Sequence, residues 1–405
     1  MTDQPYLVPA IVRDPLPDPE SVGEDADLVA AIRNEITERG PITFARFMER
    51  ALYEPGHGYY RRPETGPGRA CADFLTAPEA HPIFGAAIGL LVAEAWAAMG
   101  SPAPFRILES GAGTGALAAG LLAGLRDTGS PLFDAVRYVP DEVEASRLPA
   151  FRARLTAEGL ADRLAEDAGA AGADAPWAGA VAANEVLDAL PVHRVIGRPG
   201  GLRELLVTVN EDGAFIHVEA EPTTPALAAA LEAEDVHLAD GEITEVCLGI
   251  DAWLGRVTAG LARGLVVLVD YAAEPASLHG AARPAGTLRA FARHAVGGDP
   301  FRHVGRQDLT ATVDLAAVRA SAARCGLDPV GETTQAELLA RAGTTALTTT
   351  YLHRPGAGLE DAIALRSALV RLLDPRGMGA FRVLVFGRGL PPDLRLPVLD
   401  RVTRP

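Results

Sequence analysis

Lysine is absent from this chain of 405 residues, so all 37 of its basic side chains other than histidine are arginines. A Walker A phosphate loop requires a lysine. Enzymes that form Schiff bases, including those that use pyridoxal phosphate, require one as well. The sequence therefore excludes these three kinds of site.

Cysteine and histidine are also scarce. Cys71, Cys247 and Cys325 lie far apart, and their odd number argues against a disulfide framework. A reducing cytoplasm is the compartment that fits this use of cysteine, and the N-terminus lacks a charged-then-apolar signal pattern. The nine histidines are scattered, and none groups with cysteine at the spacing of metal ligands. We expect a cytoplasmic protein without a metal.

Positive charge is in the minority, and long apolar runs are missing. The 53 acidic side chains leave a net charge of −16, which disfavours a large nucleic-acid footprint and mildly favours a cationic substrate. The longest apolar stretch runs from Pro82 to Met99, is interrupted by Glu94, and falls short of the ~20 residues of a membrane span. We expect a buried helix here, no membrane span and no nucleic-acid partner. The sequence gives no indication of the oligomeric state.

Short aliphatic runs alternate with helical patterns through much of the chain. Strands are expected at 105–109, 136–139, 179–183 and 265–269, and helices at 83–99, 116–125 and 146–155. The run at 265–269 is aliphatic throughout, which is typical of a strand buried on both faces. Strands that alternate with helices predict an α/β fold with a parallel sheet covered on both sides.

The remaining segments predict an elaborated domain plan. Helices are expected at 28–39 and 44–52, the second capped by Thr43. Three alternating segments predict short strands at 192–196, 204–209 and 214–218, the last two joined as a hairpin by the turn at 210–213. We therefore expect an extended acidic arm (1–27), an N-terminal helical region (28–100), a core (101–191 and 264–390), an inserted β-rich cap (192–263) and a C-terminal tail (391–405).

The strongest local signal is the glycine-rich turn after the first expected core strand. Glycines permit a tight turn and let a ligand approach the backbone. The segment Gly111-x-Gly113-x-x-Ala116 fits a dinucleotide fingerprint, whereas Glu109-x-Gly111-x-Gly113-x-Gly115 is the pattern of class I S-adenosylmethionine methyltransferases. A turn without any ligand is a third possibility. Glu109 favours the methyl donor, since an acid is unfavourable beside a pyrophosphate but attracts an ammonium group.

Polar residues follow the next strands, where ligands bind in open α/β sheets. After the second strand come Asp141, Glu142 and Glu144, each a candidate for the ribose hydroxyls or a member of a solvated loop. Asn184 and Glu185 follow the third strand, where they could hold a cationic substrate, accept a proton or cap a helix. By the same logic Asp270 and Tyr271 end the aliphatic strand. The aromatic loop from Tyr53 to Tyr60 could stack on a ligand or pack on the sheet.

An ordered series of segments over roughly residues 40–390 resembles the MidA-like class I methyltransferases, the family of the mitochondrial complex I assembly methyltransferase. The matching segments are 41–48, 52–55, 58–60, 73–79 with 84–85, the glycine turn, 184–185 with 188–191, 269–271, 286–289, His294 and 308–311. Three segments depart from the family pattern. The family usually has Gly-Pro-Gly-x-Gly after its acid, whereas this chain has Ser110-Gly111-Ala112-Gly113-Thr114-Gly115. Ala272 replaces a glycine, and Thr312 replaces a histidine.

The resemblance implies a Rossmann-like methyltransferase core with an N-terminal helical arm, an inserted substrate cap, and S-adenosyl-L-methionine as methyl donor. It implies that Thr76 and Pro78 close over the cofactor. Aligning Tyr138 with the family's second strand places Glu142 on the ribose, and Glu144 if the register slips by two. By analogy with the mitochondrial member, the acceptor is expected to be a protein arginine nitrogen.

Methyl transfer from a sulfonium is a direct displacement, so the protein mainly positions the nucleophile and excludes water. For a guanidinium, whose pKa lies above about 12, we expect Glu185 with Asn184 to orient the group. Asp188, Asp270 or His294 would take the proton. The alternatives are a small-molecule N- or O-methyltransferase, an NAD(P)-dependent oxidoreductase and a non-catalytic assembly factor.

Overall fold

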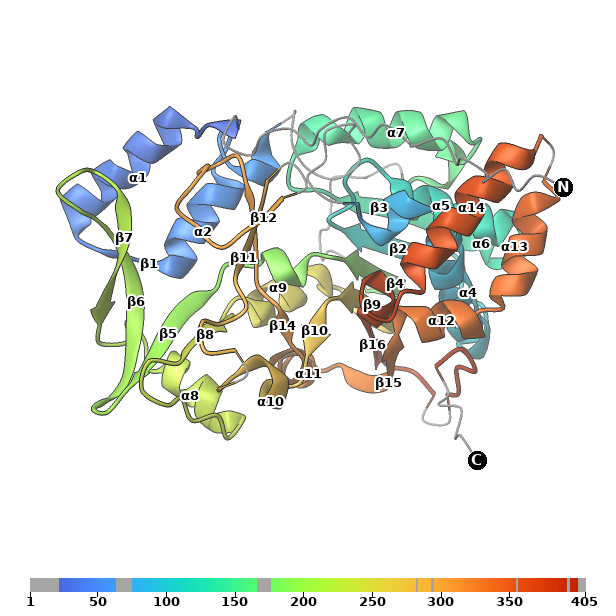
Figure 1. Ribbon diagram of the computed structural model, residues 1–405. Helices are drawn as coiled ribbons and strands as arrows, with labels where there is room; N and C mark the ends of the chain where they lie inside the picture. Colours follow the sequence, from blue (N-terminus) through green and yellow to red (C-terminus); the bar gives the residue numbers. More distant parts are fainter. Residues whose placement is uncertain are drawn as a thin grey trace, which may run out of the picture.

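The computed structural model describes residues 22–62, 75–165, 176–281, 283–292, 295–354, 356–391 and 394–399. Two bodies lie side by side (Figure 1). One is a sheet covered by helices, and the other combines α1, α2 and a set of mostly antiparallel strands. Cys71 and His294, both considered above, lie outside the described residues.

The first body is built on a six-stranded sheet in the order β15-β16-β9-β4-β2-β3. Its strands are β2 (Phe105–Ser110), β3 (Val136–Asp141), β4 (Trp177–Asn184), β9 (Leu261–Asp270), β15 (Asp328–Thr334) and β16 (Arg382–Arg388). The four predicted strands β2, β3, β4 and β9 are present and parallel. β16 is antiparallel to both of its neighbours, and neither it nor β15 was predicted. The chain leaves β2 for β3 on one side and then crosses to β4 on the other, so a topological switch point lies at β2.

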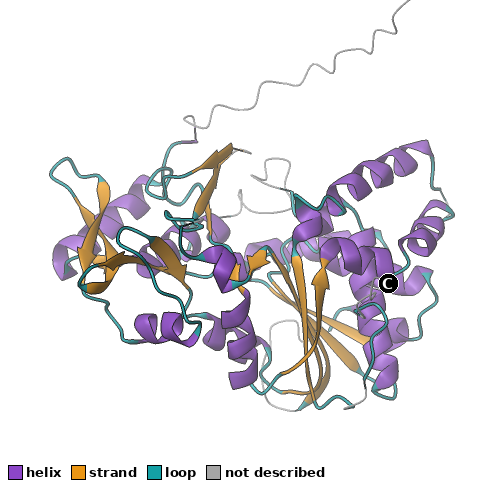
Figure 2. Cartoon of the chain, turned by 60° about the horizontal axis from the view of Figure 1, so that its bottom comes forward, coloured by secondary structure: helices purple, strands orange, loops and turns teal. Residues whose placement is uncertain are grey.

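Both faces of this sheet are buried, which explains the aliphatic run of β9. Val266 and Leu268 pack with α9 (Ile250–Val257) and α11 (Leu315–Arg324). Leu265 and Val267 point to the opposite face, against α4 (Ile83–Ala98) and α5 (Ala116–Asp127). Figure 2 shows the helices on the two sides of the sheet. The α/β fold expected from the sequence is confirmed.

The apolar stretch after Pro82 is the buried helix α4. Its small residues allow α5 to approach so closely that a Cβ atom added at Gly85 would lie 2.7 Å from the backbone nitrogen of Leu121. The prediction of a buried helix is confirmed. Among the described residues, no helix is long and apolar enough to cross a membrane.

The second body contains a sheet in the order β1-β6-β5-β8, with β7 paired to β6. Its strands are β1 (Ile42–Thr43), β5 (His193–Arg198), β6 (Gly201–Val209), β7 (Phe215–Ala220) and β8 (Ile243–Val246). The predicted hairpin joins β6 to β7, and the side chain of Asn210 closes its turn by accepting from the Ala214 N–H at 2.8 Å. On the helical side lie α1 (Ala26–Arg39) and α2 (Phe44–Tyr53), the latter capped by Thr43 as predicted.

Distant segments of the chain share the core of this body. Phe47 of α2 contacts the rings of Phe215 and Phe301 at centroid distances of 5.4 and 5.2 Å. A three-stranded sheet of β11 (Arg289–Ala292), β12 (Ala295–Gly297) and β13 (Asp308–Thr310) also belongs here. The domain boundaries remain a prediction. The structure adds that β1 pairs with β6 of the expected cap, and that α9 of the same segment packs on the core sheet.

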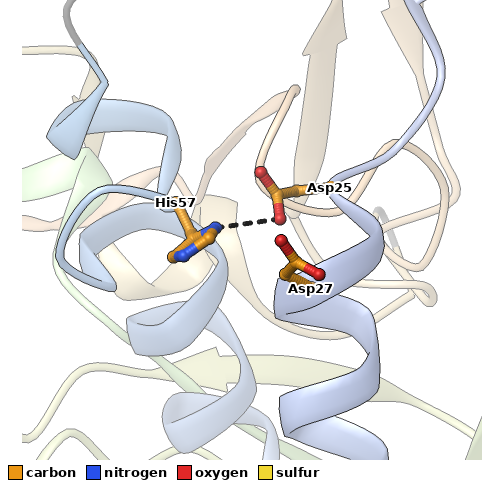
Figure 3. Close-up of side chains that lie close together, drawn as sticks. All are labelled: Asp25, Asp27 and His57. Atoms are coloured by element: carbon orange, nitrogen blue, oxygen red, sulfur yellow. Dashed lines mark hydrogen bonds and ion pairs between the residues drawn. The ribbon is translucent and has the colours of Figure 1, made fainter.

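Asp25 anchors the beginning of α1. Its carboxylate accepts from the Leu28 N–H and from Nδ1 of His57, both at 3.0 Å (Figure 3). Its own N–H donates to the Val304 carbonyl at 2.9 Å. The expected acidic arm therefore ends in a capped helix that includes Asp27, while residues 1–21 lie outside the described residues.

The remaining elements connect the two bodies or cover the sheet of one of them. They are α3 (Ala77–Ala80), α6 (Leu132–Ala135), α7 (Leu148–Ala157), α8 (Ala226–Ala233), β10 (Ala272–Ala273), α10 (Pro275–Leu278), β14 (Val313–Asp314), α12 (Gln335–Arg341), α13 (Thr344–Leu352) and α14 (Leu359–Leu372).

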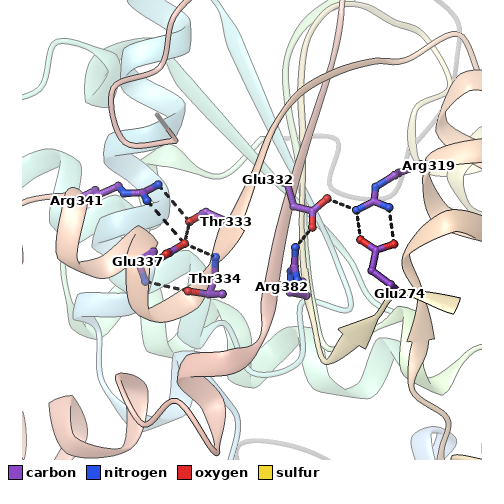
Figure 4. A network of polar contacts seen from close by, with 8 residues as sticks. All are labelled: Glu274, Arg319, Glu332, Thr333, Thr334, Glu337, Arg341 and Arg382. Atoms are coloured by element: carbon purple, nitrogen blue, oxygen red, sulfur yellow. Dashed lines mark hydrogen bonds and ion pairs between the residues drawn. The ribbon is translucent and has the colours of Figure 1, made fainter. Parts of the chain in front are cut away.

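Charged side chains hold the edge strand β15 in place. Glu332 accepts from Arg319 of α11 and Arg382 of β16, and Arg319 also pairs with Glu274 (Figure 4). At the end of the strand, Thr334 and Glu337 form a capping box that starts α12. These contacts leave β15 charged on its exposed side, which disfavours pairing with another chain.

Candidate functional site

A cavity of about 380 Å³ opens at the carboxyl ends of β2, β3 and β4, next to the switch point. Most of the predicted site residues line it: Thr76, Pro78, Glu109, Gly111, Gly113, Glu142, Asn184 and Glu185. Gly115 and Asp188 do not line this cavity.

The glycine turn has the backbone conformation that only glycine adopts easily. Gly111 and Gly113 have φ angles of 73° and 51°, in the left-handed region. A Cβ atom at Gly111 would also lie 2.7 Å from a methyl group of Val186. Gly115 starts α5 with a φ of 84°, and a Cβ atom there would lie 2.9 Å from the ring of Phe151. Gly115 therefore allows the turn to enter α5, and it does not itself line the cavity.

Glu109 is buried at the end of β2, and its carboxylate accepts from the Tyr138 hydroxyl at 2.7 Å. Burial raises the pKa of Glu109 to about 8, and the hydrogen bond from Tyr138 offsets part of this rise. Such a carboxyl group ionises readily only when a cation approaches it. Its position is therefore suited to a ligand that carries an ammonium group.

Two of the three candidate ribose acids, Asp141 and Glu142, line the cavity, and Glu144 does not. Oε2 of Glu142 accepts from the Gly113 N–H at 2.7 Å, so this side chain also braces the glycine turn. Its other oxygen accepts from Arg147 at 3.1 Å. The structure thus brings the acid after the second strand to the cavity, although the ribose contact itself stays a prediction.

The segment around Thr76 and Pro78 lies against the glycine turn through α3. The carboxylate of Glu79 accepts from the Thr114 hydroxyl at 3.1 Å and from Arg154 at 3.2 Å. The Ala77 N–H points to Oε1 of Glu185 at 3.4 Å. These contacts attach α3 to two edges of the cavity, so that it forms part of the wall.

Glu185 has an unusual backbone for a residue with a side chain, with a φ of 53°. Its N–H donates to the Val269 carbonyl at 2.8 Å, and its carboxylate accepts from the Asn184 amide at 3.0 Å. Burial, reinforced by the nearby carboxyl group of Asp188, raises the pKa of Glu185 to about 8. A residue held in such a conformation is a candidate for a functional role.

Asp270 organises the loop that carries Glu185 and Asp188. One of its oxygens accepts from the N–H groups of Leu187 and Asp188 at 3.0 and 3.3 Å, and the other from the Tyr271 N–H at 2.9 Å. Burial raises the pKa of Asp188 to about 6 and that of Asp270 well above its usual value. Among the described residues, no arginine forms an ion pair with Glu185, Asp188 or Asp270. The cluster is therefore short of positive charge.

A second cavity, of about 410 Å³, meets the first at Glu185, which lines both. Asp188 lines this second cavity. Glu185 thus lies between the two cavities, whereas Asp188 lines only the second of them.

The structure also brings residues to the first cavity that the sequence analysis missed. Trp253 and Arg256 reach it from α9, a helix within the expected cap whose pattern gives no hint of a ligand. Tyr53 and Tyr60 line the cavity and stack on each other at 5.6 Å. Tyr59 is buried in the core of the second body. Stacking of this aromatic loop on a ligand stays a prediction.

Comparisons with known proteins decide between the ligands that the glycine turn could hold. Residues 87–333 match the family model described as "Putative S-adenosyl-L-methionine-dependent methyltransferase". The Drosophila melanogaster "Protein arginine methyltransferase NDUFAF7 homolog, mitochondrial" is 30% identical, over 90% of this chain and 85% of its own length. This chain belongs to the MidA-like class I methyltransferases.

Other MidA-like relatives agree with this assignment. The human "Protein arginine methyltransferase NDUFAF7, mitochondrial" is 28% identical over 70% of this chain and 66% of its own. A Burkholderia thailandensis protein, described as a "likely methyl transferase" and solved with S-adenosyl-homocysteine bound, superposes with a TM-score of 0.80 at 34% identity. The match covers 96% of this chain and 98% of that protein. The MidA-like chain is therefore an S-adenosyl-L-methionine-dependent methyltransferase. Its glycine turn is accordingly interpreted as a site for this methyl donor and not for a dinucleotide.

Proposed function

We propose that this MidA-like enzyme methylates a nitrogen of a protein arginine. One observation carries the proposal: Glu185 lines both cavities, so a single carboxylate faces the donor site and a second, separate space. The curated relatives, which are 26–30% identical, are named protein arginine methyltransferases, which supports the choice of acceptor.

The residues of the first cavity fit the methyl donor. S-adenosyl-L-methionine supplies a methyl group already activated on a sulfonium, so its site has to hold a cation and exclude water. We assign Glu109 to its ammonium group, Glu142 to its ribose and the backbone of Gly111 and Gly113 to close contact, while Gly115 preserves the turn. Thr76 and Pro78 cover the site from α3.

The acids around Glu185 fit a guanidinium acceptor. Arginine keeps its proton up to a pKa above about 12, so a proton must leave when a methyl group is attached. A carboxylate can orient the planar guanidinium through paired hydrogen bonds, which we assign to Glu185 with Asn184 holding its carboxylate. Since an approaching cation favours the ionised form of a carboxyl group, acceptor binding would ionise Glu185. We assign Asp188 as the group that takes the proton.

A small amine is the second candidate acceptor, because 410 Å³ lies within the range of roughly 300–1,000 Å³ typical of small-molecule sites. A cytoplasmic location and the absence of a nucleic-acid partner also stay predictions, from cysteine use and net charge.

The test is to incubate the purified full chain with S-adenosyl-L-methionine labelled in its methyl group and a lysate treated to remove small molecules, and then to hydrolyse the protein fraction. The proposal expects label in methylarginine, and little label with the Glu185→Gln variant. Label that appears only when the small-molecule fraction is restored would assign a small acceptor. Binding of S-adenosylhomocysteine without any labelled product would favour the assembly-factor interpretation.

A further inference from the structure

The second cavity combines charges of both signs. Its walls come from the ends of β4 and β9, from the sheet of β11 and β13, and from the chain after α14. Its acids are Glu185, Asp188 and Asp308, and the last two are 6% and 0% exposed. Carboxyl groups, which an approaching cation would ionise, therefore lie at its inner end.

Three arginines line the same cavity at its outer end. Arg289 and Arg376 are exposed, and Arg283 is half-buried. Arg289 is the first residue of β11, Arg283 precedes that strand, and Arg376 follows α14. Because Asp188 and Asp308 are buried whereas Arg289 and Arg376 are exposed, a ligand that enters from solvent would meet these arginines before it reached the buried acids.

Among the described residues, these arginines have no carboxylate partner, in contrast to several other surface arginines of this protein. On the surface, Arg198, Arg319 and Arg324 each form ion pairs at normal distances. Within the part of the chain that the structure describes, Arg283, Arg289 and Arg376 form none. In a protein with 53 acidic side chains, three unpaired guanidinium groups around one opening indicate that an anion belongs there.

We propose that the second cavity receives an arginine side chain whose own polypeptide carries aspartate or glutamate next to it, with those carboxylates held by Arg283, Arg289 and Arg376. This inference rests on the proposed function and adds a sequence preference to it. The inner acids match the guanidinium, and the outer arginines match the flanking carboxylates. The outer arginines also offset, at this one opening, the repulsion that a net charge of −16 exerts on an acidic polypeptide.

The aromatic side chains of this cavity are consistent with such a ligand. Phe291 and Phe381 also line it, and the ring centroids of Phe381 and Tyr271 lie 5.6 Å apart. A flat guanidinium group stacks well on aromatic rings. The site thus offers the arginine side chain a face to lie on, an acid at its tip and positive charge near its backbone.

The experiment uses synthetic 13-residue peptides with one central arginine, flanked by aspartates, by asparagines or by lysines. Binding is measured by fluorescence anisotropy with S-adenosylhomocysteine present, and turnover with labelled S-adenosyl-L-methionine. Because exposed ion pairs are individually weak, we expect about tenfold tighter binding of the aspartate peptide than of the asparagine peptide. The preference should weaken with added salt, since screening acts within about 10 Å at 0.1 M.

The decisive variant is Arg289→Gln with Arg376→Gln. Its matched control, Arg39→Gln with Arg366→Gln, removes the same charge from two exposed arginines that do not line this cavity. The inference expects the preference to drop to about twofold in the first variant and to persist in the control. Equal loss in both variants, or methylation of all peptides without a charge preference, would overturn the inference and leave the proposed function standing. If no peptide is bound or methylated, both this inference and the proposed function are contradicted.

Discussion

The two cavities that meet at Glu185 are built from different parts of the polypeptide. The first includes a glycine turn, where the φ angles of 73° and 51° at Gly111 and Gly113 disfavour any other residue. The second is lined by the long side chains of Arg283, Arg289 and Arg376. A backbone that requires glycine tolerates few substitutions, whereas long side chains at the surface can be exchanged one at a time. Under the proposed function, the donor site is therefore the constant part of the enzyme, and the acceptor site is the part that single substitutions can adjust.

The strongest test of this separation is Glu185→Gln. Loss of the shared carboxylate should lower kcat by about 10²-fold, the usual cost of a reactant that is no longer well oriented. Affinity for S-adenosylhomocysteine should stay within about threefold, since the donor-side groups remain in place. The exposed Glu158 gives a matched control, because Glu158→Gln changes the same charge at a distance from both cavities. Normal turnover in Glu185→Gln would show that the cavities do not share a functional group.

The second test uses pH and Glu109, which belongs to the donor site alone. Its raised pKa of about 8 means that a proton competes with the ligand ammonium below that pH. The affinity for S-adenosylhomocysteine should therefore rise from pH 6 to pH 8, by at most about tenfold per unit, and then level off. Calorimetric titration measures this directly. In Glu109→Gln the affinity should be lower and the rise should disappear; a rise of unchanged steepness would assign the pH dependence to another group.

The third test compares two glycines with the same backbone conformation. Gly111 and Gly129 have φ angles of 73° and 67°, so alanine at either costs about 1–2 kcal/mol of stability. Only at Gly111 would the new Cβ atom meet Val186. Gly111→Ala should weaken donor binding about tenfold, roughly 1.4 kcal/mol, while Gly129→Ala should leave it unchanged. Thermal unfolding and calorimetry on both variants separate backbone strain from the binding effect.

The smallest expected effect concerns the wall that α3 adds to the donor site. Glu79→Gln weakens its contacts with Thr114 and Arg154, and such half-exposed contacts contribute about 0.5–1 kcal/mol each. Donor affinity should fall about threefold to fivefold. A double-mutant cycle with Thr114→Val measures the coupling. No coupling would mean that α3 holds its position without Glu79.

Local chemistry accounts for what could be predicted. Thr43 begins α2, the aliphatic run of β9 is buried on both faces, and Asn210 closes the β6–β7 turn, each through residues a few positions apart. Glu109 and Glu185 could be found because they end parallel strands, which meet at one edge of a sheet.

Contacts between distant segments account for what could not be predicted. β16 (Arg382–Arg388) enters between β9 and β15, and no local pattern states which strand it will join. Trp253 reaches the donor cavity from a segment expected to be cap. Arg289 and Arg376 line one cavity because β11 and the chain after α14 lie close together in the fold. The hydrophobic periodicity of a sequence indicates which side of a helix or strand is buried, but not which other element packs against that side.

The pairing of β1 with β6 also sets an order of events during synthesis. Ile42 of β1 pairs with Val207 of β6, and the backbone N–H of Asp25 donates to the carbonyl of Val304. At about 5–20 residues per second, the ribosome needs on the order of ten seconds to make β6 after β1. During that time Phe44 and Phe47, both fully buried in the finished protein, have no strand to cover them. Helix α2 is thus made well before the strands that enclose it, and until then its aromatic side chains stay exposed on the nascent chain.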